Sequence, residues 1–364
     1  MMHRARWLLS LAALVAGTLG CSGGGGGDAA AAGGGSPPTG QIPYETLGEY
    51  GFFTGNMVDH VGRPGVVPYD VNAVLWADNA TKERFVVLPE GQTLGWTERE
   101  DWQVPLGTIV IKAFFFPEDL RDAGGPRRAI ETRLLILEDE GWTSHTYVWN
   151  DAQTEAVREV AGKRVPVSYL DLAGEAQSGD YLVPNENQCK GCHARDDRTE
   201  LLGLVTPQVN RVVSRDGADV EQLDWMAAQG MFATPPSPAA LARFADPFGD
   251  GPLDARARAY LGANCAHCHR PGGGGGDSGL VLLEWETTPS KNGVCKQPAA
   301  AGAGTGGRSH DIVPGHPEES IMPFRMSSTD PEIKMPELPN LRPDEQGVAL
   351  ISEWIAAMTP EGCP

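Results

Sequence analysis

Residues Tyr260 to His269 read Tyr-Leu-Gly-Ala-Asn-Cys-Ala-His-Cys-His, and residues Cys189 to His193 read Cys-Lys-Gly-Cys-His. Each stretch has two cysteines at positions i and i+3 and a histidine directly after the second one. On one helical turn both sulfur atoms project from the same side, so both can bond to one edge of a porphyrin. The Cys-x-x-Cys-His pattern is the attachment signature of c-type haem. The sequence therefore predicts two covalently bound haems c.

The predicted site residues are four thioether cysteines and two proximal histidines, namely Cys189, Cys192, Cys265, Cys268, His193 and His269. Two Cys-x-x-Cys pairs also occur in zinc ribbons, where about 15 to 20 residues separate them. Here 265 − 192 − 1 leaves 72 residues between the pairs, which disfavours zinc. A thioredoxin-like redox motif does not fit either, because no βαβ pattern surrounds the two sites.

The predicted sixth ligand of the second iron is Met335, which lies in a proline-containing segment ahead of the last predicted helix. A thioether ligand raises the reduction potential of a haem and closes the site to small molecules. The alternatives at this position are Met326, Met322 and His316.

The sixth ligand of the first iron has several candidates. Met226 and Met231 follow the first motif in an amphipathic stretch and are the first choice. Met57, His60 and His145 lie upstream and are alternatives. An open sixth position is a further alternative, and it would be the place for catalysis.

Two features near the second motif are expected to have no chemical role. His267 lies inside its own attachment turn, so we expect its side chain to face solvent. The glycine run from Gly272 to Gly276 lacks the Lys-Ser/Thr ending of a phosphate-binding loop and follows no strand, so we expect a flexible loop.

The N-terminus has the pattern of an exported protein. Basic residues precede an apolar run from Trp7 to Ala16, so residues 1–20 are predicted to be a signal peptide. Residues 18–21 read Thr-Leu-Gly-Cys, which resembles a bacterial lipobox and predicts a membrane anchor through lipid on Cys21. We expect a lipoprotein of the cell envelope, facing the periplasm or the outer surface; a soluble periplasmic protein is the alternative.

Cysteine count and charge fit this location. Four thioether cysteines and one lipidated cysteine leave 7 − 4 − 1 = 2 residues, Cys295 and Cys363. An oxidising compartment predicts a disulfide between them, with two free thiols as the alternative. The formal net charge is −19, and loss of Arg4 and Arg6 with the signal peptide makes it about −21. An acidic chain of this kind is a poor binder of nucleic acid. We expect it to bind a basic redox protein, such as a dehydrogenase or a small cytochrome.

Residues 21–41 are glycine- and alanine-rich and are predicted to form a flexible tether. Residues 42–184 are predicted to form an all-β domain, either a sandwich or barrel-like. Its expected strands are Arg84 to Leu88, Gly107 to Phe116, Ile130 to Leu137 and His145 to Trp149. Its five tryptophans are expected to pack in the core, with a platform for a glycan or a partner as the alternative; they are Trp76, Trp96, Trp102, Trp142 and Trp149.

Helical patterns dominate after Pro184. Residues 185–250 are predicted to carry the first haem and residues 251–364 the second. An apolar face from Leu253 to Leu261 runs into the second motif, and another from Val348 to Met358 predicts a last helix. The fold class is therefore α+β and multidomain, with an N-terminal all-β domain followed by mainly α-helical cytochrome c segments.

With these motifs, the chain resembles a bacterial dihaem c-type cytochrome lipoprotein family, and its C-terminal part resembles class I cytochrome c. The likeness extends from about Tyr44 to the C-terminus. It rests on residues 147–152, 187–193, 260–272, 311–315, 325–326, 334–337 and 353–355. Members of the family are largely predicted electron-transfer proteins, so the resemblance implies covalent haem and electron transfer.

Three functions remain open from the sequence. The first is an electron carrier between a periplasmic or extracellular redox enzyme and an acceptor. The second is a dihaem peroxidase or related oxidase that uses the first haem. In the third, the β-rich domain is a binding module that docks the cytochrome on a partner.

Overall fold

The computed structural model describes residues 42–299, 302–337 and 340–364. The predicted signal peptide, Cys21 and the tether lie outside these residues. The described chain is a mixed α+β protein, as the sequence predicts. None of its helices has the length and apolar character needed to span a bilayer.

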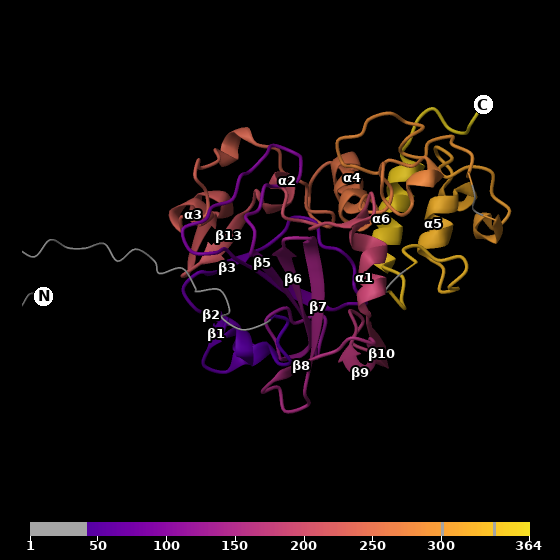
Figure 1. Cartoon of the computed structure of the whole chain (residues 1–364). Coiled ribbons are helices and arrows are strands. Elements are labelled where there is room, and N and C mark those ends of the chain that lie inside the picture. The colour runs from indigo at the N-terminus through magenta and orange to yellow at the C-terminus, as the bar shows by residue number, and fades with distance from the viewer. Residues whose placement is uncertain (1–41, 300–301, 338–339) are drawn as a thin grey trace, which may run out of the picture. The chain divides into compact units, whose positions relative to one another are not determined.

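The largest element is a six-stranded antiparallel sheet in which each strand pairs with the next one in sequence (Figure 1). Its strands are β3 (Val66–Tyr69), β4 (Thr81–Val87), β5 (Ile109–Pro117), β6 (Arg127–Glu138), β7 (Gly141–Trp149) and β8 (Ala156–Arg158). The four predicted strands are confirmed as β4 to β7, with ends that differ by a few residues. The barrel-like alternative is wrong, because β3 and β8 do not pair in the described chain and the sheet stays open.

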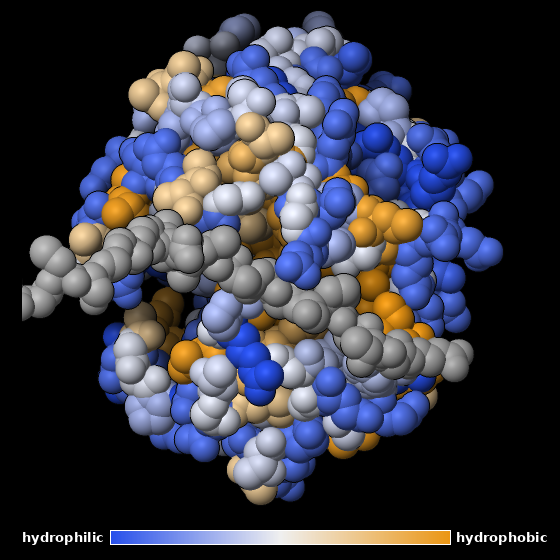
Figure 2. All heavy atoms as spheres, turned by 60° about the vertical axis from the view of Figure 1, so that its left-hand side comes forward, coloured by the Kyte–Doolittle hydropathy of each residue, from blue (hydrophilic) through white to orange (hydrophobic). Residues whose placement is uncertain are grey.

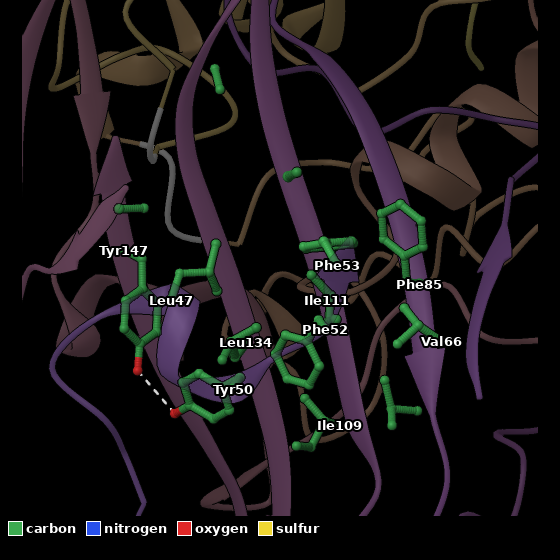
Figure 3. Packing of buried hydrophobic residues seen from close by; sticks show 14 of the residues in the cluster. Leu47, Tyr50, Phe52, Phe53, Val66, Phe85, Ile109, Ile111, Leu134 and Tyr147 are labelled. Atoms are coloured by element: carbon green, nitrogen blue, oxygen red, sulfur yellow. Dashed lines mark hydrogen bonds between the residues drawn. The ribbon is translucent and has the colours of Figure 1, made fainter. Parts of the chain in front are cut away.

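One face of the sheet is covered by the first described residues. Alternate residues of β5, including Ile111 and Phe115, pack there against η1 (Leu47–Tyr50) and β1 (Phe53–Thr54) (Figure 3). The hydroxyl groups of Tyr50 and Tyr147 lie 2.9 Å apart in this cluster. This face of the sheet is therefore covered and forms part of a hydrophobic core.

The opposite face is covered in two parts. At one end, β9 (Lys163–Leu170) and β10 (Ala176–Val183) form a hairpin that packs on Phe114 and Phe116. At the other end, Val110 and its neighbours pack against residues 201–232. That segment contains α2 (Thr206–Val209), β13 (Val212–Arg215), β14 (Ala218–Glu221) and α3 (Gln222–Ala228). Residues before and after the domain boundary predicted at residue 184 therefore share one buried core.

The C-terminal part is helical. Helices α4 (Leu253–Asn264), α5 (Ile321–Met326) and α6 (Glu345–Ala356) lie together in this part (Figure 1). Their apolar side chains share one buried cluster. Asp344 caps α6 by accepting a hydrogen bond from the backbone N–H of Gly347 at 3.0 Å. Helices α4 and α6 confirm the two predicted helices.

The remaining elements are short. They are β2 (Val61–Gly62), η2 (Met57–Asp59), α1 (Glu186–His193), β11 (Ala194–Arg195), β12 (Arg198–Thr199), η3 (Pro238–Ala240), η4 (Gly276–Ser278), η5 (Gly302–Thr305) and η6 (Pro317–Glu319). Of the five tryptophans of residues 42–184, Trp102 and Trp149 are buried in the core and Trp96 and Trp142 pack half-buried against it, which confirms the packing prediction for these four, while Trp76 is half-buried. On the face drawn in Figure 2, hydrophilic residues surround smaller hydrophobic groups.

Candidate functional site

The first Cys-x-x-Cys-His motif lies on α1. Asn185 accepts a hydrogen bond from the backbone N–H of Gln188 at 2.9 Å, and the side chain of Gln188 accepts one from the N–H of Asn185 at 2.9 Å. This reciprocal capping box fixes where the helix begins. The helix ends at His193, so both cysteines and the histidine belong to its last two turns.

The second motif begins where α4 ends. Cys265 follows the last helical residue, and the backbone N–H of His269 donates to the carbonyl oxygen of Cys265 at 2.9 Å. The motif therefore continues as a tight turn after the helix, and the long helix sets its direction.

The two motifs lie against each other. The Sγ atom of Cys268 is 3.4 Å from the carbonyl oxygen of Gly191, 77 positions away in the chain. A hydrogen bond between the thiols of Cys192 and Cys268 holds the pKa of Cys192 below its ordinary value and raises that of Cys268. The two predicted attachment segments are thus in direct contact.

The segments that follow the motifs reinforce this contact. Arg195 and Gly273 form an isolated antiparallel bridge. The carboxylate of Glu200, downstream of the first motif, lies 3.2 Å from the guanidinium of Arg270, downstream of the second. The motifs are therefore held together by backbone pairing and by an ion pair.

The histidine that ends the first motif is held in one tautomer. Nδ1 of His193 lies 2.8 Å from the carbonyl oxygen of Glu200, which can only accept a hydrogen bond. Burial lowers the pKa of His193 to about 4, so the ring is neutral at pH 7 and Nε2 carries no proton. An unprotonated Nε2 is the atom that binds a metal.

The histidine that ends the second motif has an equivalent partner. Nδ1 of His269 lies 3.0 Å from the hydroxyl of Ser278, and that hydroxyl donates to the carbonyl oxygen of Gly275 at 2.6 Å. Because the hydroxyl proton is already used, Nδ1 of His269 is the donor. Burial lowers the pKa of His269, which keeps this ring neutral as well.

A cavity of about 300 Å³, here called cavity 1, lies beside the second motif. Cys265, Cys268 and His269 line it, together with Met326 and Met335. The backbone N–H of Met335 donates to the carbonyl oxygen of Arg325 at 2.9 Å, which fixes the methionine loop on α5. The structure thus brings the predicted distal methionine to the same cavity as its proximal histidine.

A second cavity of about 340 Å³, here called cavity 2, lies beside the first motif and under the sheet. Cys189, Cys192 and His193 line it. The side chains of Arg84 and Lys112 enter it from β4 and β5. A buried location so rich in basic residues was not expected from the sequence.

Three residues line both cavities: Trp76, Cys192 and His267. The expectation that His267 faces solvent is wrong, because its exposed fraction is only 9%. The contact between the two motifs covers its side chain. Trp76 comes from the β-rich region and is fixed by its indole N–H, which donates to the carbonyl oxygen of Arg342 at 3.0 Å.

The glycine run is not a free loop. A Cβ atom added to Gly275 would lie 2.9 Å from ring atoms of His269, and one added to Gly273 would overlap the backbone of Cys268. The expectation of a flexible loop is therefore wrong. The segment packs closely against the second motif, and this packing needs glycine.

The other predicted ligands lie elsewhere. Met226 and Met231 are buried in the core between the sheet and α3, and neither lines cavity 2. Met57 and His60 belong to the closed core on the other face of the sheet, where Nδ1 of His60 lies 2.8 Å from Glu83. The remaining candidates, His145, Met322 and His316, line neither cavity.

The two remaining cysteines lie away from both cavities. Cys295 and Cys363 form a disulfide, with their Cα atoms 5.3 Å apart. The bridge ties the C-terminal end to the loop that follows the second motif. The lipidation predicted at Cys21 lies outside the described residues.

Comparisons with protein-family models, with curated proteins and with solved structures gave no match. The site is therefore interpreted from its own geometry. Three features of the site were not predicted from the sequence: the contacts of the two motif histidines with Ser278 and with the carbonyl of Glu200, and the basic residues that line cavity 2. Only Lys112 left a signal, since it stands within an apolar strand, whereas Arg84 and Arg133 each follow polar residues.

Proposed function

We propose that this chain is an exported dihaem c-type cytochrome that carries single electrons between a redox enzyme in the periplasm or outside the cell and an acceptor. The observation that carries the proposal is the meeting of two Cys-x-x-Cys-His motifs, each beside its own cavity. The resemblance to a dihaem lipoprotein family supports it.

The residues present fit haem c at both motifs. Cys189 and Cys192 at cavity 2, and Cys265 and Cys268 at cavity 1, supply the thiols for thioether bonds. Each motif ends in a neutral histidine whose Nδ1 is already used in a hydrogen bond, so Nε2 is available to the iron. A bound haem supplies a one-electron couple whose potential depends on its axial ligands and burial.

The chain orients and protects these groups. Glu200 and Ser278 hold the two imidazole rings, while the loop fixed on α5 presents Met335 at cavity 1. Because Cys192 and Cys268 touch, groups bound at the two motifs would be neighbours. This contact supports electron transfer between the sites. Lipid on Cys21 would keep the protein at a membrane surface.

The proposal is tested by producing the full chain, with its own N-terminal segment, in a host that attaches haem c. We expect two haems per chain by the pyridine haemochrome assay. We expect one haem in the double variant Cys189→Ser/Cys192→Ser. The double variant Cys295→Ser/Cys363→Ser is the matched control, because it also removes two cysteines but should retain both haems.

Haem-free wild-type protein, from a host that loads a reference cytochrome c, would overturn the proposal. For electron transfer, the reduced holoprotein is mixed with a basic cytochrome c in a stopped-flow experiment. We expect rapid oxidation that slows as ionic strength rises, because the acidic chain attracts a basic partner. A rate independent of salt would contradict this choice of partner.

A second candidate is an enzyme that reduces a small molecule, such as a peroxide, at the first site. It is favoured by one observation: no methionine lines cavity 2 in the described part of the chain. Turnover of hydrogen peroxide by the holoprotein, with reduced cytochrome c as donor, tests it. Absence of turnover would remove this candidate and leave the electron carrier.

A further inference from the structure

Three basic residues stand side by side on the sheet face that borders cavity 2. In the strand register, Arg84 of β4 is directly opposite Lys112 of β5, and Lys112 is directly opposite Arg133 of β6. Directly opposed side chains have Cβ atoms about 4.5 to 5.5 Å apart, and like charges in these positions repel each other. The side chain of Arg84 is only 7% exposed. The row therefore concentrates positive charge in a poorly hydrated place.

Two members of this row have acidic partners, and one of these pairs is weaker. Arg133 forms an ion pair with Glu131, whose side chain is 0% exposed and also accepts a hydrogen bond from Tyr181 at 2.7 Å. Arg84 reaches Asp70 at 3.4 Å, and this half-exposed carboxylate is shared with Arg211. The ion pair of Arg84 is therefore long, and Arg84 shares its carboxylate partner with Arg211.

Lys112 has no ion pair or hydrogen bond from its side chain to any residue that the structure describes. Its Nζ lies 5.1 Å from the ring centroid of Phe114. A buried ammonium without a counter-charge is costly, so such groups are paired or lose their proton, and burial lowers the pKa of Lys112 well below its ordinary value. Lys112 therefore lacks a negative partner in the described chain, and Arg84 has only a shared one.

The row also lies at a break in the apolar packing. On one side, Val110 packs with the segment that contains α2 and α3; on the other, Phe114 packs with the β9–β10 hairpin. Between these two clusters, the side chains of the row border cavity 2, where Cys189 and His193 also lie. The cationic row is thus the floor of the cavity next to the first motif.

The basic residues at the rim of cavity 2 differ from Lys112, because each has an acidic partner. The pairs are Arg99 with Glu284 at 3.7 Å, Arg195 with Asp101 at 3.3 Å and Arg270 with Glu200 at 3.2 Å. Of the Arg and Lys side chains that line cavity 2, Lys112 is thus the one without an ion pair among the described residues.

We propose that Arg84 and Lys112, supported by Arg133, form a binding site for a carboxylate or a similar oxyanion at the floor of cavity 2. The guanidinium of Arg84 suits two-point contact with two oxygen atoms, and the ammonium of Lys112 adds a point charge. This inference rests on the proposed function in one respect: the propionates of a haem held at Cys189 and Cys192 are one source of such groups. A free oxyanion substrate is the other source.

The test uses the holoprotein and the variants Lys112→Met and Arg84→Gln. Lys163→Met is the matched control, because Lys163 is exposed on β9. The midpoint potentials of both haems are measured by spectroelectrochemical titration. Sodium nitrite and sodium acetate are then titrated in, and changes in the Soret band are followed.

If propionates occupy the site, neither salt changes the spectrum. The two variants then lower the midpoint potential of one haem, because loss of positive charge favours the ferric state. If a free oxyanion occupies it, nitrite or acetate binds saturably, and each variant weakens binding by about tenfold, as expected for loss of one charge-assisted hydrogen bond. Wild-type potentials in both variants, together with no oxyanion binding, would overturn the inference.

A last experiment tests the oxyanion site independently of haem binding. If the chain carries no haem, thermal unfolding of the haem-free protein is followed with increasing nitrite and acetate at constant ionic strength. Stabilisation of the wild type that is lost in Lys112→Met supports an oxyanion site even though the haem proposal has failed. Equal behaviour of wild type and Lys112→Met would overturn the site itself.

Discussion

Among individual residues, Lys82 shows most clearly how burial changes chemistry in this fold. It lies on β4, and its Nζ donates to the carbonyl oxygen of Ala80 at 2.8 Å. Burial, together with the charges of Arg84 and Arg133, lowers the pKa of Lys82 from 10.5 to about 7. The folded protein therefore holds this proton less tightly than the unfolded chain does.

This difference predicts a pH dependence of stability. Between pH 7 and about pH 10 the unfolded chain binds more protons at Lys82 than the folded protein, so the free energy of unfolding rises with pH. Below pH 7 both forms are protonated and this contribution stays constant. In Lys82→Met the rise should be smaller by at most about 1.4 kcal/mol per pH unit. Urea denaturation at several pH values measures it.

The exposed Lys163→Met variant is the control for Lys82→Met and should follow the wild type. Parallel curves for wild type and Lys82→Met over this pH range would contradict the assignment of a lowered pKa to Lys82.

Among the structural elements, the segment from Gly272 to Gly276 differs most from its sequence-based expectation. Glycine-rich segments are typically flexible linkers. Here the backbone N–H of Asp196 donates to the carbonyl oxygen of Gly272 at 3.0 Å, and Gly273 pairs with Arg195. The absence of side chains lets the segment approach the second motif and join it to the first.

Two adjacent substitutions test this role. Gly273→Ala should destabilise the protein by about 1 to 3 kcal/mol, because its Cβ would overlap the backbone of Cys268. Gly274→Ala is the matched control: its Cβ would lie 3.7 Å from the nearest atom, the carbonyl oxygen of Gly191, and should be tolerated. Thermal unfolding compares the two, and equal stability would show that the segment is loose.

In the whole molecule, the β-rich region is joined to the C-terminal helical part through buried polar contacts. Asp78 is buried and accepts hydrogen bonds from the backbone N–H of Leu341 at 2.9 Å and of Arg342 at 2.9 Å. The backbone N–H of Trp76 donates to the side chain of Asn264, the last residue of α4, at 2.7 Å. These contacts place residues 340–344 at the wall of cavity 1.

Removing the carboxylate should loosen that wall. Asp78→Ala leaves two partly buried backbone donors unpaired, at a cost of up to about 1 kcal/mol for each group. We expect faster amide hydrogen exchange in residues 340–344, measured by mass spectrometry, with little change in α1. Asp151→Ala, at a side chain that is 98% exposed, is the control and should leave exchange unchanged. Unchanged exchange in Asp78→Ala would show that this junction does not hold the loop.

Features that depend on local interactions could be predicted from the sequence, and those that depend on contacts between distant segments could not. Helices α4 and α6 were predicted because their apolar periodicity is local. The β9–β10 hairpin was missed even though Val165, Val167 and Tyr169 alternate with polar residues, since Pro166 disfavours a strand interior. The choice between a sandwich and a barrel stayed open because strand patterns do not say whether the end strands pair.

By itself, the sequence determined both Cys-x-x-Cys-His motifs, the candidate Met335 and the leftover pair Cys295 and Cys363, since spacing and counting reveal these features. Tertiary structure alone decided that the two motifs touch, that His267 is buried between the cavities, and that the basic floor of cavity 2 exists. The basic row depends on strand register, which joins Arg84, Lys112 and Arg133 across three strands. Contacts of that range arise from folding of the whole chain, so no local pattern records them.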